Sequence, residues 1–299
     1  MNLRGIFKNS PFFIQLSILI GFVVFGAIFS SVLFSILALA MGIPFDGNTA
    51  NPDTLRIMQF WVSLFSFLVP AYLLALLFST DTNEYLQLRT PSSPNLLLTI
   101  IIILASTPFL NLMVYLNEQV VFPEALKPLE EVLRNMEDSA AALTKQLLIT
   151  DSTGTFLFNI LLFGVVAGVG EELLFRGVFQ RIFEKVTKNP HIVIWVVAFI
   201  FSAFHFQFYG LIPRMLIGAL LGYMLLYTRS IWVPILAHFT NNTLSVVSYY
   251  FVSDTQQIEQ FDEMGIHSMQ WLPLLSLIVV ISLVVLMKKM NRIPVGQRE

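Results

Sequence analysis

The sequence predicts an all-α integral membrane protein, a bundle of about eight transmembrane helices with one amphipathic helix between the third and the fourth. Hydrophobic residues make up 56% of the 299 residues, charged residues only 12%, and the mean hydropathy is +0.75. Polar surface is therefore too scarce to cover a water-soluble globule of this size. The apolar residues also fall into runs of about 20, the length at which a helix crosses a bilayer.

The charge balance and the missing cysteines exclude other classes. The formal net charge is −2, which gives no nucleic-acid signature. The chain has no cysteine, so disulfide frameworks and Cys-ligated zinc or iron–sulfur sites are excluded. Any metal would have to use His, Asp, Glu or Asn.

Eight candidate spans lie between polar punctuation, and we interpret 1–299 as a single transmembrane domain. The predicted spans are 12–41, 57–79, 95–117, 155–179, 192–208, 211–227, 232–251 and 271–287. Arg4 and Lys8 before the first run imitate a signal peptide, but a run of about 30 residues is too long for one, which indicates a retained helix. Pro70 and Pro108 lie inside the second and third spans, where a missing N–H predicts kinks.

The positive charges orient the bundle. With eight spans, four basic groups fall on one side of the membrane. They are Arg4 and Lys8 before the first span, Arg181, Lys185 and Lys188 after the fourth, Arg229 after the sixth, and Lys288, Lys289, Arg292 and Arg298 at the end of the chain. The opposite side carries the acidic residues Asp254, Glu259, Asp262 and Glu263. The positive-inside rule then places both termini in the cytoplasm.

The one long polar stretch, 118–151, predicts an amphipathic helix on the other side of the membrane. Apolar residues recur there in alternating steps of three and four: Leu126, Leu129, Leu133, Met136, Ala140, Leu143 and Leu147. Pro128 suits a first helical turn. We interpret it as an interfacial or bundle-packing helix rather than an arm that grips substrate.

Glu171 and Glu172, with Arg176 one turn later, lie in the middle of the fourth apolar run. A charged residue at a membrane helix centre costs roughly 2.5 to 3.5 kcal/mol, so an intramembrane carboxylate pair is a functional-site hypothesis. Glu172 and Arg176 share a helix face and could be a self-neutralising ion pair. Glu171 has no local partner.

Two further apolar runs carry histidines. His205 lies four residues after Phe201, and Asn242 four residues after His238, so each pair shares a helix face. At about 1.5 Å per residue from the cytoplasmic turns, Glu171 and His205 lie at similar depth, whereas His238 is only about 10 Å above its turn, a mismatch. His191 and His267 are interpreted as surface residues. Glycines at 164, 168, 170, 218 and 222 predict close helix packing.

The three patterns Glu171-Glu172-x-x-x-Arg176, Phe201-x-x-x-His205 and His238-x-x-x-Asn242, on successive hydrophobic helices, resemble the CAAX-protease and bacteriocin-processing family of intramembrane proteases. The resemblance covers about 155–251, which we interpret as the catalytic core. It implies hydrolysis of peptide bonds in membrane-associated substrates, and a multi-pass protein of a bacterial inner membrane. The partners expected are the lipid bilayer and a membrane-associated peptide or protein.

The resemblance implies a role for each residue. Glu171 would take a proton from water shared with His205, Glu172 held by Arg176 would orient them, and His238 with Asn242 would donate to the oxyanion. Alternatively Glu171, His205 and His238 would ligate zinc or another divalent metal. The sequence leaves open the metal, the oligomeric state and whether the substrate is prenylated.

Two other functions use the same residues. A bacteriocin-immunity or binding protein would keep the motifs without turnover. A proton-coupled transporter would use Glu and His as a proton relay, but it predicts inverted repeats with interrupted helices, and none is evident in the sequence.

Overall fold

The computed structural model describes residues 3–40, 51–252, 265–266 and 269–291, and within these ranges the chain contains helices and no strand. The elements in order are α1 Phe12–Ala40, α2 Pro52–Ser63, η1 Leu64–Leu68, α3 Val69–Phe78, α4 Thr82–Tyr85, α5 Ser93–Glu118, η2 Glu124–Leu126, α6 Lys127–Leu148, α7 Thr153–Asn159, η3 Ile160–Ala167, α8 Gly168–Glu172, η4 Leu173–Phe179, α9 Gln180–Phe183, α10 Pro190–Ala203, α11 Leu211–Thr228, α12 Trp232–Phe251 and α14 Leu272–Met290. The predicted all-α class is confirmed.

Six of the described helices are long and apolar enough to cross a membrane, so the predicted number of eight is not confirmed. They are Phe12–Ala40, Pro52–Phe78, Ser93–Glu118, Thr153–Phe183, Leu211–Thr228 and Leu272–Met290. The helix α12 has 20 residues but is not among the six, because its sequence carries polar residues on the turns around His238. The helix α10 has 14 residues, which at 1.5 Å each span about 21 Å, less than the roughly 30 Å hydrocarbon core.

The fifth predicted span, 192–208, is therefore wrong at its carboxyl end. The helix α10 stops at Ala203 and the chain turns, with Phe206 in the left-handed region at φ 54°. The turn therefore places His205 beyond the helix instead of on its face. Non-helical backbone at this depth is tolerated where protein surrounds it or it lines a cavity.

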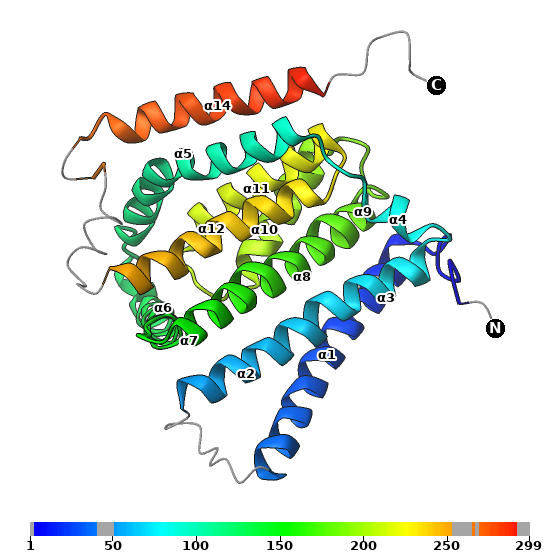
Figure 1. The fold of residues 1–299 in the computed structure, drawn as a ribbon, viewed down its shortest axis with the longest axis horizontal. Helices are drawn as coiled ribbons and strands as arrows, with labels where there is room; N and C mark the ends of the chain where they lie inside the picture. Colours follow the sequence, from blue (N-terminus) through cyan, green and yellow to red (C-terminus); the bar gives the residue numbers. More distant parts are fainter. Residues whose placement is uncertain (1–2, 41–50, 253–264, 267–268, 292–299) are drawn as a thin grey trace.

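The first and last helices frame the bundle (Figure 1). The start of α1 and the end of α14 lie at the same end of the molecule, and α6 lies across the opposite end. One apolar core joins residues of α1, α3, η4 and α10, and a second joins α5, α11, α12 and α14. The helices α11 and α12, which carry part of the candidate site, contribute residues to both cores.

Two of the long helices contain wide π turns. In the second, the π segment η1 comes directly before α3, whose second residue is Pro70. In the fourth, η3 and η4 flank the single α-helical turn of α8 that bears Glu171 and Glu172. Pro108 lies within the continuous helix α5. Because π turns displace backbone hydrogen bonds and occur often at functional sites, the Glu pair occupies a locally unusual stretch.

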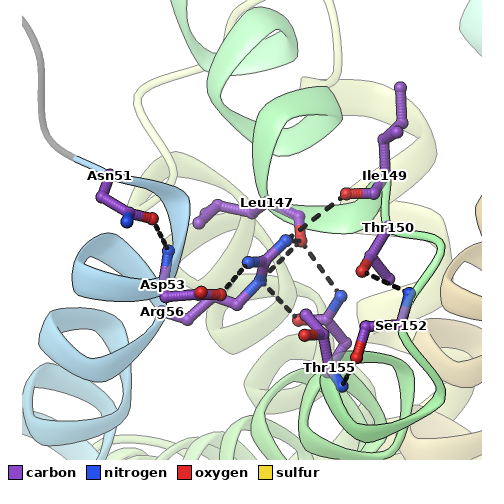
Figure 2. Close-up of polar contacts among 9 residues, drawn as sticks. Asn51, Asp53, Arg56, Leu147, Ile149, Thr150, Ser152 and Thr155 are labelled. Carbon is purple, nitrogen blue, oxygen red and sulfur yellow. Dashed lines mark hydrogen bonds and ion pairs between the residues drawn. The ribbon is translucent and has the colours of Figure 1, made fainter.

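The predicted amphipathic helix is α6, and two clusters fix it. Figure 2 shows Arg56 of α2 beneath the carboxyl end of α6: its Nε and Nη2 donate to Leu147 O at 3.0 and 2.7 Å, and its Nη1 to Asp53 Oδ1 at 2.6 Å. Asn159 completes this cluster with its Oδ1 3.1 Å from Arg56 Nε. A cation at these carbonyls also suits the negative end of the helix.

The amino end of α6 is held by Glu130. Its carboxylate accepts from Phe122 N at 3.0 Å and from Arg134 Nε at 2.9 Å. The backbone hydrogen bond from Phe122, and then the bond from Arg134, lower the pKa of Glu130 below its ordinary value. The helix is therefore tied down at both of its ends.

Some sequence predictions fall outside the described residues. These are the end of the first span at Met41, the acidic group Asp254, Glu259, Asp262 and Glu263, the surface position of His267, and the basic residues Arg292 and Arg298.

Candidate active site

A buried ion pair forms the base of the site. Glu172 and Arg176 are 0% and 1% exposed, and Arg176 Nη1 lies 2.7 Å from Glu172 Oε1. Arg176 Nη2 donates to the backbone oxygen of Gly218 at 2.9 Å, so the pair also joins η4 to α11. A Cβ on Gly218 would lie 3.3 Å from that Nη2 atom, which explains a glycine at this contact.

His238 connects the pair to the second carboxylate. Its Nδ1 lies 2.8 Å from Glu172 Oε1, and its Nε2 lies 3.9 Å from Glu171 Oε2. The latter distance exceeds that of a hydrogen bond. Glu171 Oε2 and Glu172 Oε2 are both buried and have no hydrogen-bond partner among the described residues. Because a buried polar atom without a partner is rare, these oxygens indicate a functional site.

Glu171 faces a cavity of about 130 Å³. The residues that line it come from α8, α10, the following turn, α11 and α12: Glu171, Phe201, His205, Arg214, Ile217, Leu221, His238, Asn241 and Asn242. Of the two carboxylates, Glu171 therefore lines the cavity and Glu172 does not. At about 30 Å³ per water in the liquid, the space matches roughly four waters.

His205 belongs to the turn after α10 and lies at the edge of this cavity. Its Nδ1 lies 3.0 Å from Phe201 O, so the ring caps the last turn of the helix. The Phe201 ring packs edge-on against both histidines, with centroid distances of 5.2 Å to His205 and 6.0 Å to His238. His205 is therefore both exposed and part of the cavity lining.

The side chain of Asn242 is hydrogen-bonded to the backbone of another helical segment. Its Nδ2 donates to Phe163 O in the π segment η3 at 2.9 Å, and its Oδ1 accepts from Asn241 Nδ2 at 3.2 Å. An amide has two N–H groups, so each of these asparagines keeps one further donor. Asn242 therefore holds η3 and still lines the cavity.

The depth mismatch expected for His238 does not keep it from the Glu pair. The sequence places the cytoplasmic turn near Lys188, whereas α9 ends at Phe183, five residues earlier or about 7.5 Å of helix. Close packing of α8 against α12 also brings His238 near the Glu pair, since a Cβ on Gly168 would lie 3.4 Å from Phe239 N. The two helices meet at this point because glycine leaves the room.

Sequence reasoning missed Arg214 and Asn241. Arg214 is a cation inside the predicted span 211–227, and the cost of burying charge that singled out Glu171 applies equally to it. Asn241 precedes Asn242 but falls outside the four-residue spacing. Of the other histidines with a described placement, His191 is exposed, and its Nδ1 lies 2.9 Å from Tyr223 Oη.

The alternative metal set, Glu171, His205 and His238, does not converge. Within the described ranges no three side chains of the His, Asp and Glu types come together closely enough to hold a metal ion. The arrangement does not fit a three-ligand metal, and no chemical step below uses one.

Comparisons with known proteins cover the stretch that carries the motif residues. Residues 153–244 match the family model described as type II CAAX prenyl endopeptidase Rce1-like. An uncharacterized protein of Bacillus subtilis strain 168, YpbD, is 34% identical over 85 residues, which cover 27% of this chain and 40% of that relative. The chain thus spans less than half of YpbD, and no solved structure matches.

Proposed function

We propose that this chain is an intramembrane endopeptidase of the CAAX-protease family that hydrolyses peptide bonds of membrane-associated substrates, a proposal supported by the match of residues 153–244 to the Rce1-like family model. The observation that carries this proposal is Glu171, whose buried oxygen without a partner lies beside two histidines in a small cavity. Whether the substrates are prenylated or otherwise lipidated is a matter for experiment. We place the protein in a bacterial inner membrane with both termini cytoplasmic.

Glu171 acts as the general base. A water bound at Glu171 attacks the peptide carbonyl carbon while the carboxylate takes one of its protons, and a tetrahedral oxyanion forms. The C–N bond then breaks as Glu171 returns that proton to the leaving amine. A positioned general base and acid contributes typically 10²- to 10⁴-fold to the rate.

The hydrogen bonds of the two histidines fix their tautomers. The Phe201 carbonyl only accepts, so Nδ1 of His205 carries the proton and its Nε2 is left as an acceptor for the same water. The Glu172 carboxylate likewise accepts a hydrogen bond from Nδ1–H of His238. His238 Nε2 is then an acceptor when the ring is neutral and donates only as imidazolium.

The oxyanion requires donors, and the amides supply them. Asn242 and Asn241 each keep one N–H beyond the bonds described above, and protonated His238 would add a third donor. One such donor lowers the barrier by about 3 to 4 kcal/mol in other hydrolases. Glu172 and Arg176 do not line the cavity and hold His238 in place.

Membrane proteomes test the proposal. Cells that produce the wild-type chain or Glu171→Gln at equal levels are compared by mass spectrometry of peptide termini. New termini in membrane proteins that need Glu171 are expected. A cellular phenotype that survives in Glu171→Gln, without any such termini, would instead indicate a binding or immunity protein.

A further inference from the structure

Arg214 is the cation of the catalytic cavity. It lies in the first turn of α11, and its Nη2 donates to Gln207 Oε1 at 2.8 Å. Its Nη1 is buried and has no hydrogen-bond partner among the described residues. No carboxylate of the described chain lies within ion-pair distance of it, whereas Arg176 is paired with Glu172 at 2.7 Å. Arg214 thus keeps a buried donor and makes no direct ion pair with the described residues.

The position of Arg214 is set from the amphipathic helix. Glu137 of α6 accepts from Gln207 Nε2 and from Tyr209 N, both at 3.0 Å. The amide nitrogen of Gln207 is thereby turned to Glu137 and its oxygen to Arg214. A Cβ on Gly210 would lie 2.9 Å from Arg214 Nη2, so the guanidinium rests closely against the backbone there. The side chain is held rather than free to swing out.

A guanidinium held this way selects an oxygen anion. Its planar fork matches the two oxygens of a carboxylate, and a bond between charged partners is about twice as strong as a neutral one. The cavity also contains Glu171, whose negative charge would repel a substrate carboxylate. A cation in the lining of the same cavity offsets that repulsion.

We propose that Arg214 binds a carboxylate of the substrate next to the scissile bond, either the chain's own terminal carboxylate or an Asp or Glu side chain. The inference rests on the proposed function, because Glu171 and Arg214 share one cavity of about 130 Å³. So small a space places the bound carboxylate within a residue or two of the attacked carbonyl. Arg214 is a specificity-determining residue, and Glu137 and Gln207 are positioning residues.

Three peptides separate the two sources of the carboxylate. They share one hydrophobic, N-acylated sequence and end in a free carboxylate, in a carboxamide, or in a carboxamide with an Asp two residues before the end. The full chain in lipid nanodiscs is compared with Arg214→Gln, Arg214→Lys and, as a control for lost charge, Arg229→Gln, whose exposed side chain lies outside the cavity.

For the carboxylate peptide that fits, we expect Arg214→Gln to raise KM roughly 10- to 100-fold with little change in kcat, since bonds to charged groups are of that strength. Arg214→Lys should restore part of the affinity, and Arg229→Gln should match the wild type. The plain carboxamide should show the same KM in the wild type and in Arg214→Gln. An equal KM rise for acid and amide peptides, or none for either, would overturn the inference.

Binding to the inactive enzyme separates this inference from the proposed function. The same peptides are titrated into Glu171→Gln and Glu171→Gln/Arg214→Gln, with tryptophan fluorescence as the readout. A preference for the acid peptide that disappears with Arg214 supports the inference even if the wild type cleaves nothing. Equal binding of acid and amide peptides to Glu171→Gln refutes it even if cleavage occurs.

Discussion

Arg56 and Arg176 are two buried arginines with the same local design and different surroundings. Each pairs with a carboxylate one turn before it, at 2.6 Å for Asp53 and 2.7 Å for Glu172, and each donates to a backbone carbonyl of another helix. The side chain of Asp53 is 69% exposed, whereas that of Glu172 is 0% exposed. Only Glu172 also binds a histidine, His238.

The difference teaches that a buried charge in a membrane protein does not by itself mark chemistry. Around Arg56 every partner is backbone, an amide or a solvated carboxylate, and the cluster fixes the end of α6. Around Arg176 the hydrogen bonds continue through Glu172 to His238, whose Nε2 lies 3.9 Å from Glu171 Oε2. Glu171 lines a cavity, and this oxygen has no hydrogen-bond partner among the described residues. The features that indicate function are the buried Glu171 oxygen without a hydrogen-bond partner and the cavity that Glu171 lines.

The largest effect on stability should come from Arg176→Ala. It leaves the carboxylate of Glu172 buried without its cation, a change that costs about 3 to 5 kcal/mol. We expect a fall in the thermal unfolding midpoint in detergent and a loss of cleavage. The double variant Arg176→Met/Glu172→Leu, which removes both charges, should recover part of the midpoint and none of the activity.

Arg56→Ala should lower the free energy of unfolding less than Arg176→Ala does. Asp53 can return to solvent, and only the carbonyls at the end of α6 lose their donor. Hydrogen bonds to charged groups contribute about 1.5 to 3 kcal/mol. We expect faster hydrogen exchange at the carboxyl end of α6, with kcat within a few-fold of the wild type. A loss of cleavage as complete as in Arg176→Ala would remove the distinction between the two clusters.

The effect of pH on the stability of α6 should be smaller than the effect of Arg56→Ala. Since the pKa of Glu130 is lowered in the folded protein, its stabilisation is present above its ordinary unfolded pKa and is lost as the pH falls through the folded value. The protection of backbone amides at the amino end of α6, measured relative to their intrinsic exchange rates, should therefore fall under acidic conditions. In Glu130→Gln this fall in protection should be absent, because position 130 no longer titrates.

Chelation should have the smallest effect. Because Glu171, His205 and His238 do not converge as metal ligands, we expect cleavage by purified protein to be unchanged after treatment with a chelator. The metal content of the same preparation is measured beside it. Stoichiometric zinc together with activity that the chelator abolishes would contradict a water activated by Glu171 alone.

Much of this arrangement was predictable from the sequence. Composition predicted a membrane protein, and the three-and-four spacing of apolar residues predicted the amphipathic helix α6. The cost of a charge inside a membrane identified the Glu pair as a candidate site. The end of α10 was not predictable, because Phe206 continues an apolar run and nothing local indicates its positive φ. The contact of His238 with Glu172 depends on helix packing at Gly168, and the role of Gln207 depends on Glu137, 70 residues away.

The roles of the six motif residues stay proposals, and Glu171 is the one on which they depend. The most direct test is the kcat of Glu171→Gln in lipid nanodiscs on a substrate identified from the termini, with Glu84→Gln as a matched control outside the cavity. The proposed base predicts a fall of about 10²- to 10⁴-fold with an unchanged unfolding midpoint and a control that matches the wild type. A kcat equal to that of the wild type would contradict it.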